Sequence, residues 1–488
     1  MDTIMKKKSI AVNALFNIFK TCASIIFPLI TYPYVVRILE VKDMGNIEFS
    51  RSIINYVNLI AGLGIANYAI REGAKIRDNK VKFSNFANQM FSLNLIMTFV
   101  ALLGLTMVYY FTPYLHSYGK ILSIFSIITV GTTFVVDWIN SIYEDFVYIT
   151  IRNIIIQFIA LVLMLTLIKN KNDYLVYVGI LTFSSVGAAI PNWFYIKKYC
   201  KLKFTFHIEW KKHIKPIMML FAISVATVIY VNVDSTMLNI MKGAYDNGLY
   251  SAAVKIYNIF KNVVAAIIIV TVPRLSALSG KEDAKESKRL MKLIFNVVLS
   301  MVLPLCLLSG LLSKEIIIFI AGEKYVLAAG ALRILSLSLV FSSMASFMTT
   351  SVLLPNGKEK EILKASITSA VVNLLLNFVM IPKMSFIGAS LTTMIAELVM
   401  FLVSSKAAKK YIDLSEMKRD IMKYVISCNG IVIVWFLIRY YFNLNGIVYI
   451  LTVGIIGMVI YGLVNLYLWD IDIKKIISKC IVGRKKNG

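Results

Sequence analysis

Residues 84–111 read SNFANQMFSLNLIMTFVALLGLTMVYYF, a stretch of 28 residues without a single charged side chain. A transmembrane helix needs about 20 mainly apolar residues to cross the hydrocarbon core of a bilayer. Similar stretches recur along the whole chain of 488 residues, which is 58% hydrophobic and only 16% charged. Because about a quarter of the residues in a soluble chain are charged, the composition excludes a soluble enzyme with one anchor and predicts an all-α integral membrane protein.

Apolar stretches that are bounded by charged residues predict about fourteen transmembrane helices. Pro28 and Pro33 fall in the first of them and should bend it, since proline lacks a backbone donor. The predicted spans are residues 10–36, 46–70, 84–111, 120–142, 147–168, 174–196, 216–241, 248–272, 291–312, 326–350, 364–381, 385–405, 420–441 and 446–468.

Lys and Arg are unevenly divided between the two sides of this topology. The even-side loops and both termini hold 37 basic residues, whereas the odd-side loops hold 10. Cytoplasmic loops are enriched in Lys and Arg, so we expect both termini to be cytoplasmic. The net charge of +26 is therefore explained without nucleic acid, which would require a basic soluble domain. Residues 201–215 are interpreted as an amphipathic linker on the cytoplasmic surface, with His207 and His213 in contact with solvent.

Motifs for catalysis or cofactor binding are missing from the sequence. The five cysteines are scattered without metal-ligand spacing, and there is no nucleotide phosphate loop, HExxH motif or nucleophile elbow. We therefore expect a transporter without a catalytic site, cofactor or metal. The sequence does not identify a coupling ion, which is unknown and could be H⁺ or Na⁺.

An internal repeat appears when the chain is shifted by 203 residues. Asp43, Gly45, Ile53, Asn55, Arg71 and Ala74 then match Asp246, Gly248, Ile256, Asn258, Arg274 and Ala277. A spacing of six helices keeps the orientation, so the repeat predicts two parallel lobes around a central cleft where transporters bind cargo. The predicted domains are an N-lobe (1–200), the linker (201–215), a C-lobe of six helices (216–411), and two extra C-terminal helices with a basic tail (412–488).

Arg152 and the basic residues near span ends are counted with the loops, which leaves five basic residues inside the predicted spans, where a charge costs about 2.5 to 3.5 kcal/mol or more. Lys20, Arg51 and Lys255 are each spaced at helical intervals from other polar residues, so each lies on a polar face of its helix. Lys261 lies near the midplane of the membrane. We expect these four cations to face a water-filled cleft that binds an anion. Snorkelling or a static ion pair is the alternative for each, and we favour snorkelling for Arg333. The predicted substrate-binding residues are Lys20, Arg51, Lys255, Lys261, Asn55 and Asn258.

Four acidic residues inside spans are candidates for ion coupling or for ion pairs. Asp234 lies at about the same depth as Lys255, so the two are predicted to pair. Glu48 lies on the same polar face as Arg51. Asp137 and Glu397 would carry protons if burial raised their pKa, and interhelical hydrogen bonding is the alternative role for both.

Two sequence motifs resemble the bacterial oligosaccharide flippases. Pro28–Leu39 (PLITYPYVVRIL), followed by Ala61–Tyr68 (AGLGIANY) and Ile70-Arg71-Glu72, is similar to their opening. The segments Tyr230–Asp234 (YVNVD) and Asn247–Lys255 (NGLYSAAVK) resemble the start of their second lobe. The family is the polysaccharide transporter branch of the multidrug/oligosaccharidyl-lipid/polysaccharide exporter superfamily.

This resemblance implies a V-shaped, alternating-access flippase of the bacterial cytoplasmic membrane. Its cargo would be undecaprenyl-diphosphate-linked oligosaccharide, moved from the inner to the outer leaflet for surface polysaccharide biosynthesis. Its partners would be membrane lipids and a polysaccharide polymerase or assembly proteins. Related lipid II flippases carry cavity cations on their first, second and eighth helices, comparable to those of Lys20, Arg51 and Lys255, although two of the three are lysines here in place of arginine.

Two other functions remain open at this point. A multidrug or metabolite cation antiporter of the same superfamily would favour acidic cleft residues and often has twelve helices. An integral membrane glycosyltransferase or polysaccharide polymerase would usually carry a sizeable outer loop, and no predicted odd-side loop exceeds about a dozen residues.

Overall fold

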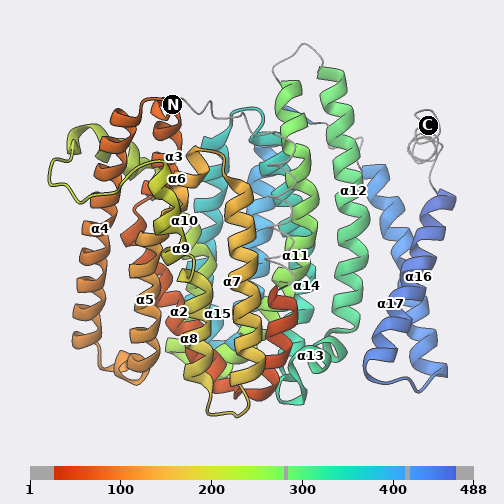
Figure 1. Cartoon of the computed structure of the whole chain (residues 1–488). Helices are drawn as coiled ribbons and strands as arrows, with labels where there is room; N and C mark the ends of the chain where they lie inside the picture. The colour runs from red at the N-terminus through yellow and green to blue at the C-terminus, as the bar shows by residue number, and fades with distance from the viewer. Residues whose placement is uncertain (1–26, 280–283, 413–417, 469–488) are drawn as a thin grey trace, which may run out of the picture. The chain divides into compact units, whose positions relative to one another are not determined.

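The computed structural model describes residues 27–279, 284–412 and 418–468. Within these ranges the chain is helical and contains no strand (Figure 1). Twelve of the described helical segments are long and apolar enough to cross a membrane. The all-α membrane fold predicted from composition is thereby confirmed.

Short breaks divide several of the membrane-spanning segments into two helices. The helices are α2 Val41–Gly62, α3 Ile65–Ile76, α4 Lys80–Phe111, α5 Gly119–Val135, α6 Asp137–Ile142, α7 Phe146–Leu167, α8 Tyr174–Val186, α9 Ala189–Tyr195, α10 Trp210–Lys242, α11 Ala244–Ser279, α12 Ala284–Leu311, α13 Ser313–Ala321, α14 Ala328–Ser346, α15 Glu359–Ala408, α16 Lys418–Tyr441 and α17 Gly446–Leu468. A π-helical segment, Phe347–Leu353, extends α14.

The number of spans agrees roughly with the fourteen predicted. Helix α15 contains a non-helical residue, Ser385, at φ 52° and ψ −133°, close to the junction between the predicted spans 364–381 and 385–405. The one long helix therefore supplies two spans. Of the predicted span 10–36, residues 27–36 are helical and residues 10–26 lie outside the described part of the chain.

Two predicted continuous helices are broken in the structure. Span 46–70 is interrupted where Leu63 and Gly64 adopt positive φ angles of 47° and 75°, and span 120–142 is interrupted at Val136, with φ 40°. Both breaks preserve the apolar character of the segment, so hydropathy alone does not reveal them. Gly64 is the one local signal, since glycine adopts the left-handed conformation without a steric penalty.

The residues pack as two units, which are not the two predicted lobes. Unit 1 holds the described residues up to Ala252 together with Ile320–Lys324 and Ser366–Thr392; unit 2 holds Ala253–Phe319, Tyr325–Ala365 and the described residues from Thr393 onward. The lobes are defined by the sequence repeat, whereas these units follow packing in one conformation. The lobe boundaries therefore stay a prediction.

A buried cluster in unit 1 joins α3, α4 and α6 to the beginning of α10. Helix α10 starts at Trp210, so only the first part of the predicted linker 201–215 lies outside a helix. His213 is 2% exposed and hydrogen-bonds to the Tyr68 hydroxyl at 2.8 Å and to Gln89 Oε1 at 3.0 Å. The expectation that His213 contacts solvent is therefore wrong, because the ring packs against Tyr68 and Phe86; His207 is exposed as expected.

The two extra C-terminal helices, α16 and α17, belong to unit 2 and lie side by side (Figure 1). Ser427 donates to Asn465 Oδ1 at 3.1 Å and links α16 to α17. The Tyr461 hydroxyl donates to the Ser300 carbonyl at 3.0 Å and links α17 to α12. Hydrogen bonds between membrane helices contribute about 0.6 kcal/mol each on average, so the Tyr461 bond helps to hold the pair against α12.

Candidate transport site

Arg51 lies in the middle of α2, and an acidic side chain only partly neutralises its charge. Its Nη1 atom is 3.5 Å from Glu48 Oε1, one helical turn away, and the side chains are 31% and 14% exposed. The guanidinium also lies 6.0 Å from the centre of the Phe125 ring and interacts with the Tyr177 hydroxyl. Arg51 therefore retains an accessible face that can receive an anion.

Polar side chains on one face of α2 form hydrogen bonds with α10. Asn55 Nδ2 donates to Asn232 Oδ1 at 2.8 Å, and the Ser52 and Tyr56 hydroxyls lie 2.8 and 3.0 Å from Thr236 Oγ1. Asn55 was predicted from the sequence as a binding residue, whereas Asn232 and Thr236 were not. Their i, i+4 spacing within an apolar span was the available signal.

Asp234 lies in a buried group of oxygen-rich side chains within unit 1. Its carboxylate accepts hydrogen bonds from the Tyr250 hydroxyl at 2.8 Å and from Asn377 Nδ2 at 2.6 Å. Thr392 in turn donates to Asn377 Oδ1 at 2.5 Å, and Asp234 is 6% exposed. Asn377 was also missed, although it is an amide inside an apolar span. The pairing of Asp234 with Lys255 stays a prediction, because Lys255 belongs to the other unit.

The beginnings of α2 and α11 approach each other at positions that the repeat had matched. A Cβ atom placed on Gly45 would overlap the carbonyl oxygen of Ala244, and one placed on Gly248 would overlap the carbonyl oxygen of Val41. Ala244 and Val41 are themselves 203 residues apart, so the two contacts are reciprocal, as expected for two elements related by a twofold axis. Asn247 Nδ2 also donates to the Gly45 carbonyl at 2.9 Å.

In unit 2, Lys261 of α11 forms an ion pair with Glu397 of α15. Lys261 Nζ lies 2.6 Å from Glu397 Oε1, and the Tyr257 hydroxyl lies 3.3 Å from the same oxygen. The Glu397 side chain is 5% exposed. The remaining predicted cleft residues of α11 are Lys255, which is half-buried, and Asn258, which is exposed. Lys20 lies outside the described residues.

Asp137 is held by Arg152, a buried arginine that was counted with the loops in the predicted topology. Arg152 lies on α7, and its Nη2 atom donates to Asp137 Oδ2 at 2.8 Å. The Arg152 side chain is 5% exposed and sits over the Tyr148 ring at 5.4 Å. An ion pair is thus the observed environment of Asp137.

A second polar cluster surrounds Asp145, between α6 and α7. Its Oδ2 atom accepts hydrogen bonds from Tyr195, Tyr199 and Lys198 at 2.6, 2.7 and 2.9 Å. Tyr143 stacks on Tyr199 with ring centres 4.0 Å apart. Burial raises the pKa of Tyr143 to about 12, and burial together with Asp145 raises the pKa of Tyr199. Both phenols are therefore neutral donors at physiological pH.

A polytopic helical protein with ionisable groups on several spans belongs to the class of membrane transporters, since such groups are retained in membranes for function. Comparison with known proteins narrows this class. A family model described as polysaccharide biosynthesis protein matches residues 10–279, more than half of the chain. The chain belongs to this family.

Curated relatives cover most of the chain at low identity. A candidate O-antigen transporter of Shigella dysenteriae is 24% identical over 394 residues, covering 79% of this chain and 97% of the relative. A candidate O-antigen transporter of Escherichia coli (strain K12) is 22% identical over 412 residues, covering 80% and 94%. The resemblance to bacterial oligosaccharide flippases is thereby confirmed, and these relatives are named as transporters and not as enzymes.

Solved structures share the fold. The lipid II flippase MurJ in an inward closed conformation superposes with a TM-score of 0.76 at 16% identity, over 97% of this chain and 100% of that one. A multidrug resistance MATE family transporter in an inward-facing conformation gives 0.54 at 14% identity, over 83% and 97%. The fold is thus common to flippases and multidrug transporters, and it does not by itself identify the cargo.

Proposed function

We propose that this protein is a flippase that moves undecaprenyl-diphosphate-linked oligosaccharide repeat units from the inner to the outer leaflet of the bacterial cytoplasmic membrane. The names of the curated relatives support a polysaccharide cargo. The observation that carries the proposal is Arg51, a partly exposed arginine inside a membrane span, whose Nη1 atom lies 3.5 Å from Glu48 Oε1. A guanidinium binds phosphate oxygens through two parallel hydrogen bonds, which suits a lipid diphosphate.

The proposed binding residues are Lys20, Arg51, Lys255, Lys261, Asn55 and Asn258, and the structure gives reason to rank them. Arg51 and Lys255 are the proposed diphosphate contacts. Lys261 is engaged by Glu397 at 2.6 Å, so it would have to exchange this partner to bind cargo. Asn55 bonds to Asn232, and this bond would have to open as well.

Transport by alternating access is supported by the contact between α2 and α11. Gly45 and Gly248 lie near the helix ends that the topology places on the outer side, and they pack against backbone carbonyls. Release of cargo into the outer leaflet requires these ends to separate. The hydrogen bonds beside them, such as Asn247 to Gly45, involve groups that water can satisfy after separation.

Among the acidic residues, Asp234 is the candidate for ion coupling if it acts independently of Lys255. Asp137 and Glu397 are each neutralised by a basic partner, Arg152 and Lys261. Asp234 accepts hydrogen bonds from the Asn377 amide and the Tyr250 hydroxyl. A carboxylate that receives such bonds can bind either a proton or a hard cation such as Na⁺.

Two measurements test the proposed function. Depletion of the protein in cells should cause a lipid-linked oligosaccharide to accumulate on the inner leaflet of the cytoplasmic membrane. In proteoliposomes, the purified protein should accelerate translocation of an undecaprenyl-diphosphate oligosaccharide. Efflux of organic cations from the same vesicles, without translocation of the lipid, would favour the multidrug antiporter and overturn the proposal.

A further inference from the structure

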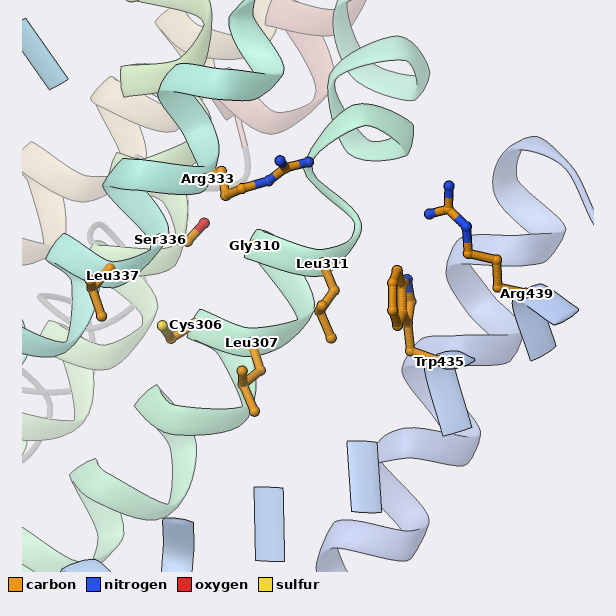
Figure 2. Close-up of a pocket in the computed structure, with 9 residues that line it drawn as sticks. All are labelled: Cys306, Leu307, Gly310, Leu311, Arg333, Ser336, Leu337, Trp435 and Arg439. Atoms are coloured by element: carbon orange, nitrogen blue, oxygen red, sulfur yellow. The ribbon is translucent and has the colours of Figure 1, made fainter. Parts of the chain in front are cut away.

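A groove in unit 2 lies between α12, α14 and α16, and none of the residues assigned to cargo lines it. It has a volume of about 570 Å³ and lies at the end of α12, the beginning of α14 and the last two turns of α16. It is lined by Cys306, Leu307, Gly310, Leu311, Arg333, Ser336, Leu337, Trp435 and Arg439. The guanidinium groups of Arg333 and Arg439 lie at the upper end in Figure 2, Leu337 lies below them, and Leu307 lies at the lower end.

The two ends of this groove therefore differ in chemistry. Arg333 and Arg439 are both exposed. Arg333 has no acidic partner within 4.0 Å among the described residues, while Arg439 sits over the Trp435 ring at 5.3 Å. The indole Nε1–H of Trp435 is buried without a hydrogen-bond partner in the described part of the chain. One end thus offers two cations and an unused donor, and the other end offers leucines.

The position of the groove along the helices fits the depth of lipid headgroups. Trp435 and Arg439 lie in the last two turns of α16, and Arg333 is the sixth residue of α14, about 8 Å from its start at 1.5 Å per residue. Tryptophan and arginine are typical of the interface between headgroups and hydrocarbon. An apolar groove that faces a bilayer is filled by lipid chains, since water does not wet leucine side chains there.

We propose that this groove binds an anionic phospholipid of the outer leaflet, with the phosphate at Arg333 and Arg439 and an acyl chain along Leu307, Leu311 and Leu337. Charge complementarity selects the headgroup, because a basic residue near the membrane surface contributes about 1 kcal/mol toward anionic lipid. The ligand is a resident lipid and not the cargo: none of the nine lining residues lies on α2 or α11, the helices of Arg51 and Lys255.

Native mass spectrometry of the purified full-length protein, with phosphatidylglycerol or phosphatidylcholine added to delipidated samples, tests this proposal. We expect phosphatidylglycerol to bind preferentially and to raise the melting temperature. Arg333→Gln and Arg439→Gln should each weaken its binding about fivefold, the equivalent of about 1 kcal/mol. The matched control is Lys314→Gln, which removes an exposed cation of unit 2 that does not line the groove.

A second variant tests the apolar end without changing charge. Gly310 faces Ser336, and a Cβ atom there would meet only the Ser336 Cβ, at 3.8 Å. Gly310→Leu should therefore fold, fill the groove and lower phosphatidylglycerol binding while both arginines remain. Trp435→Phe should have a smaller effect, since it removes the N–H donor and part of the ring but keeps an aromatic side chain and both arginines.

Several results would overturn the proposal. The protein could bind phosphatidylglycerol and phosphatidylcholine equally well. The double variant Arg333→Gln, Arg439→Gln could bind phosphatidylglycerol as well as the unchanged protein does. The control Lys314→Gln could lose as much phosphatidylglycerol binding as the arginine variants do. Inorganic phosphate that raises the melting temperature as much as the lipid does would show a simple anion site. An undecaprenyl-linked cargo that competes with phosphatidylglycerol would make the groove part of the cargo path.

Discussion

Gly45 of α2 and Gly248 of α11 pack so closely against the opposite helix that a methyl group on either would overlap its backbone. The two glycines occupy matched positions of a repeat with a spacing of 203 residues. Neither contact can be relieved by a side-chain rotation, because the opposing atoms are the carbonyl oxygens of Ala244 and Val41. The contact therefore depends on glycine, and it exists only in a conformation where these helix ends are together.

We predict that Gly45→Ala and Gly248→Ala shift the protein away from this conformation. Overpacking of this kind costs about 1 to 3 kcal/mol, which corresponds to a population shift of about 5-fold to 150-fold. Ser52, which is 2% exposed here, reports on the shift after replacement by cysteine. Its labelling by an impermeant maleimide from outside should increase in both glycine variants.

The control for this experiment is Gly104→Ala in α4, since nothing lies within 4 Å of a Cβ atom at Gly104. It should leave Ser52→Cys labelling unchanged. Identical labelling in all three glycine variants would mean that the contact between α2 and α11 does not limit opening.

A second prediction concerns Arg51 and Lys255. Neutralising either residue should abolish export of the lipid-linked oligosaccharide while the folded protein stays in the membrane. Arg51→Lys should be milder than Arg51→Ala, because the charge survives although bidentate geometry is lost. The readout is surface polysaccharide in a depleted strain that expresses each variant, with exposed Lys120→Gln as the control. Normal export by both alanine variants would assign these cations a structural role only.

The sequence predicted the fold well because the bilayer imposes a strong and simple pattern. Spans such as residues 84–111 are recognisable from hydropathy, and the glycines at 45 and 248 were identified by the repeat before their contact was visible. The break at Val136 was missed because its side chain is apolar and its positive φ leaves no trace in hydropathy.

The candidate site was less predictable, since its polar partners come from distant parts of the chain. Asn377 meets Asp234 across 143 residues, and Glu397 meets Lys261 across 136. Helical periodicity identifies a polar face but not the helix that it faces. His213 was misplaced for the same reason: the hydrogen bond to Tyr68 links positions 145 residues apart.

A third prediction separates a static ion pair from a proton carrier at Lys261 and Glu397. Glu397→Gln leaves Lys261 without its anion and should lower the free energy of unfolding by about 1.5 to 3 kcal/mol. The double variant Lys261→Met, Glu397→Leu should lose less, because apolar replacement removes the unpaired charge. Thermal unfolding in detergent measures both. Unchanged stability of Glu397→Gln, together with an altered pH dependence of transport, would instead identify Glu397 as a proton carrier.

A fourth prediction tests the orientation inferred from the division of basic residues. Asn172 and Lys360 are exposed, and the topology places them outside and inside, respectively. In a cysteine-free background, Asn172→Cys should react with an impermeant reagent in intact cells, whereas Lys360→Cys should react only after the membrane is opened. The reverse pattern would invert the topology and move both termini to the outside.

The last prediction concerns Asp234 and Lys255, whose pairing the sequence suggested from their similar depth. Asp234 already accepts hydrogen bonds from Tyr250 and Asn377, so its charge is stabilised by neutral donors as well as by any cation. If Lys255 also interacts with it, removal of Asp234 alone leaves a cation in the membrane at a cost of about 3 to 5 kcal/mol in a dry site.

A double-mutant cycle with Asp234→Asn and Lys255→Met, measured by thermal unfolding, isolates the interaction. We expect the double variant to be more stable than the sum of the single effects predicts. Asn232→Ala, which removes an amide of the same helix that bonds to Asn55, should be additive with Lys255→Met and serves as the control. Strict additivity for Asp234 and Lys255 would show that they act independently, and it would leave Asp234, with Asn377 and Thr392 around it, as the stronger candidate for the coupling-ion site.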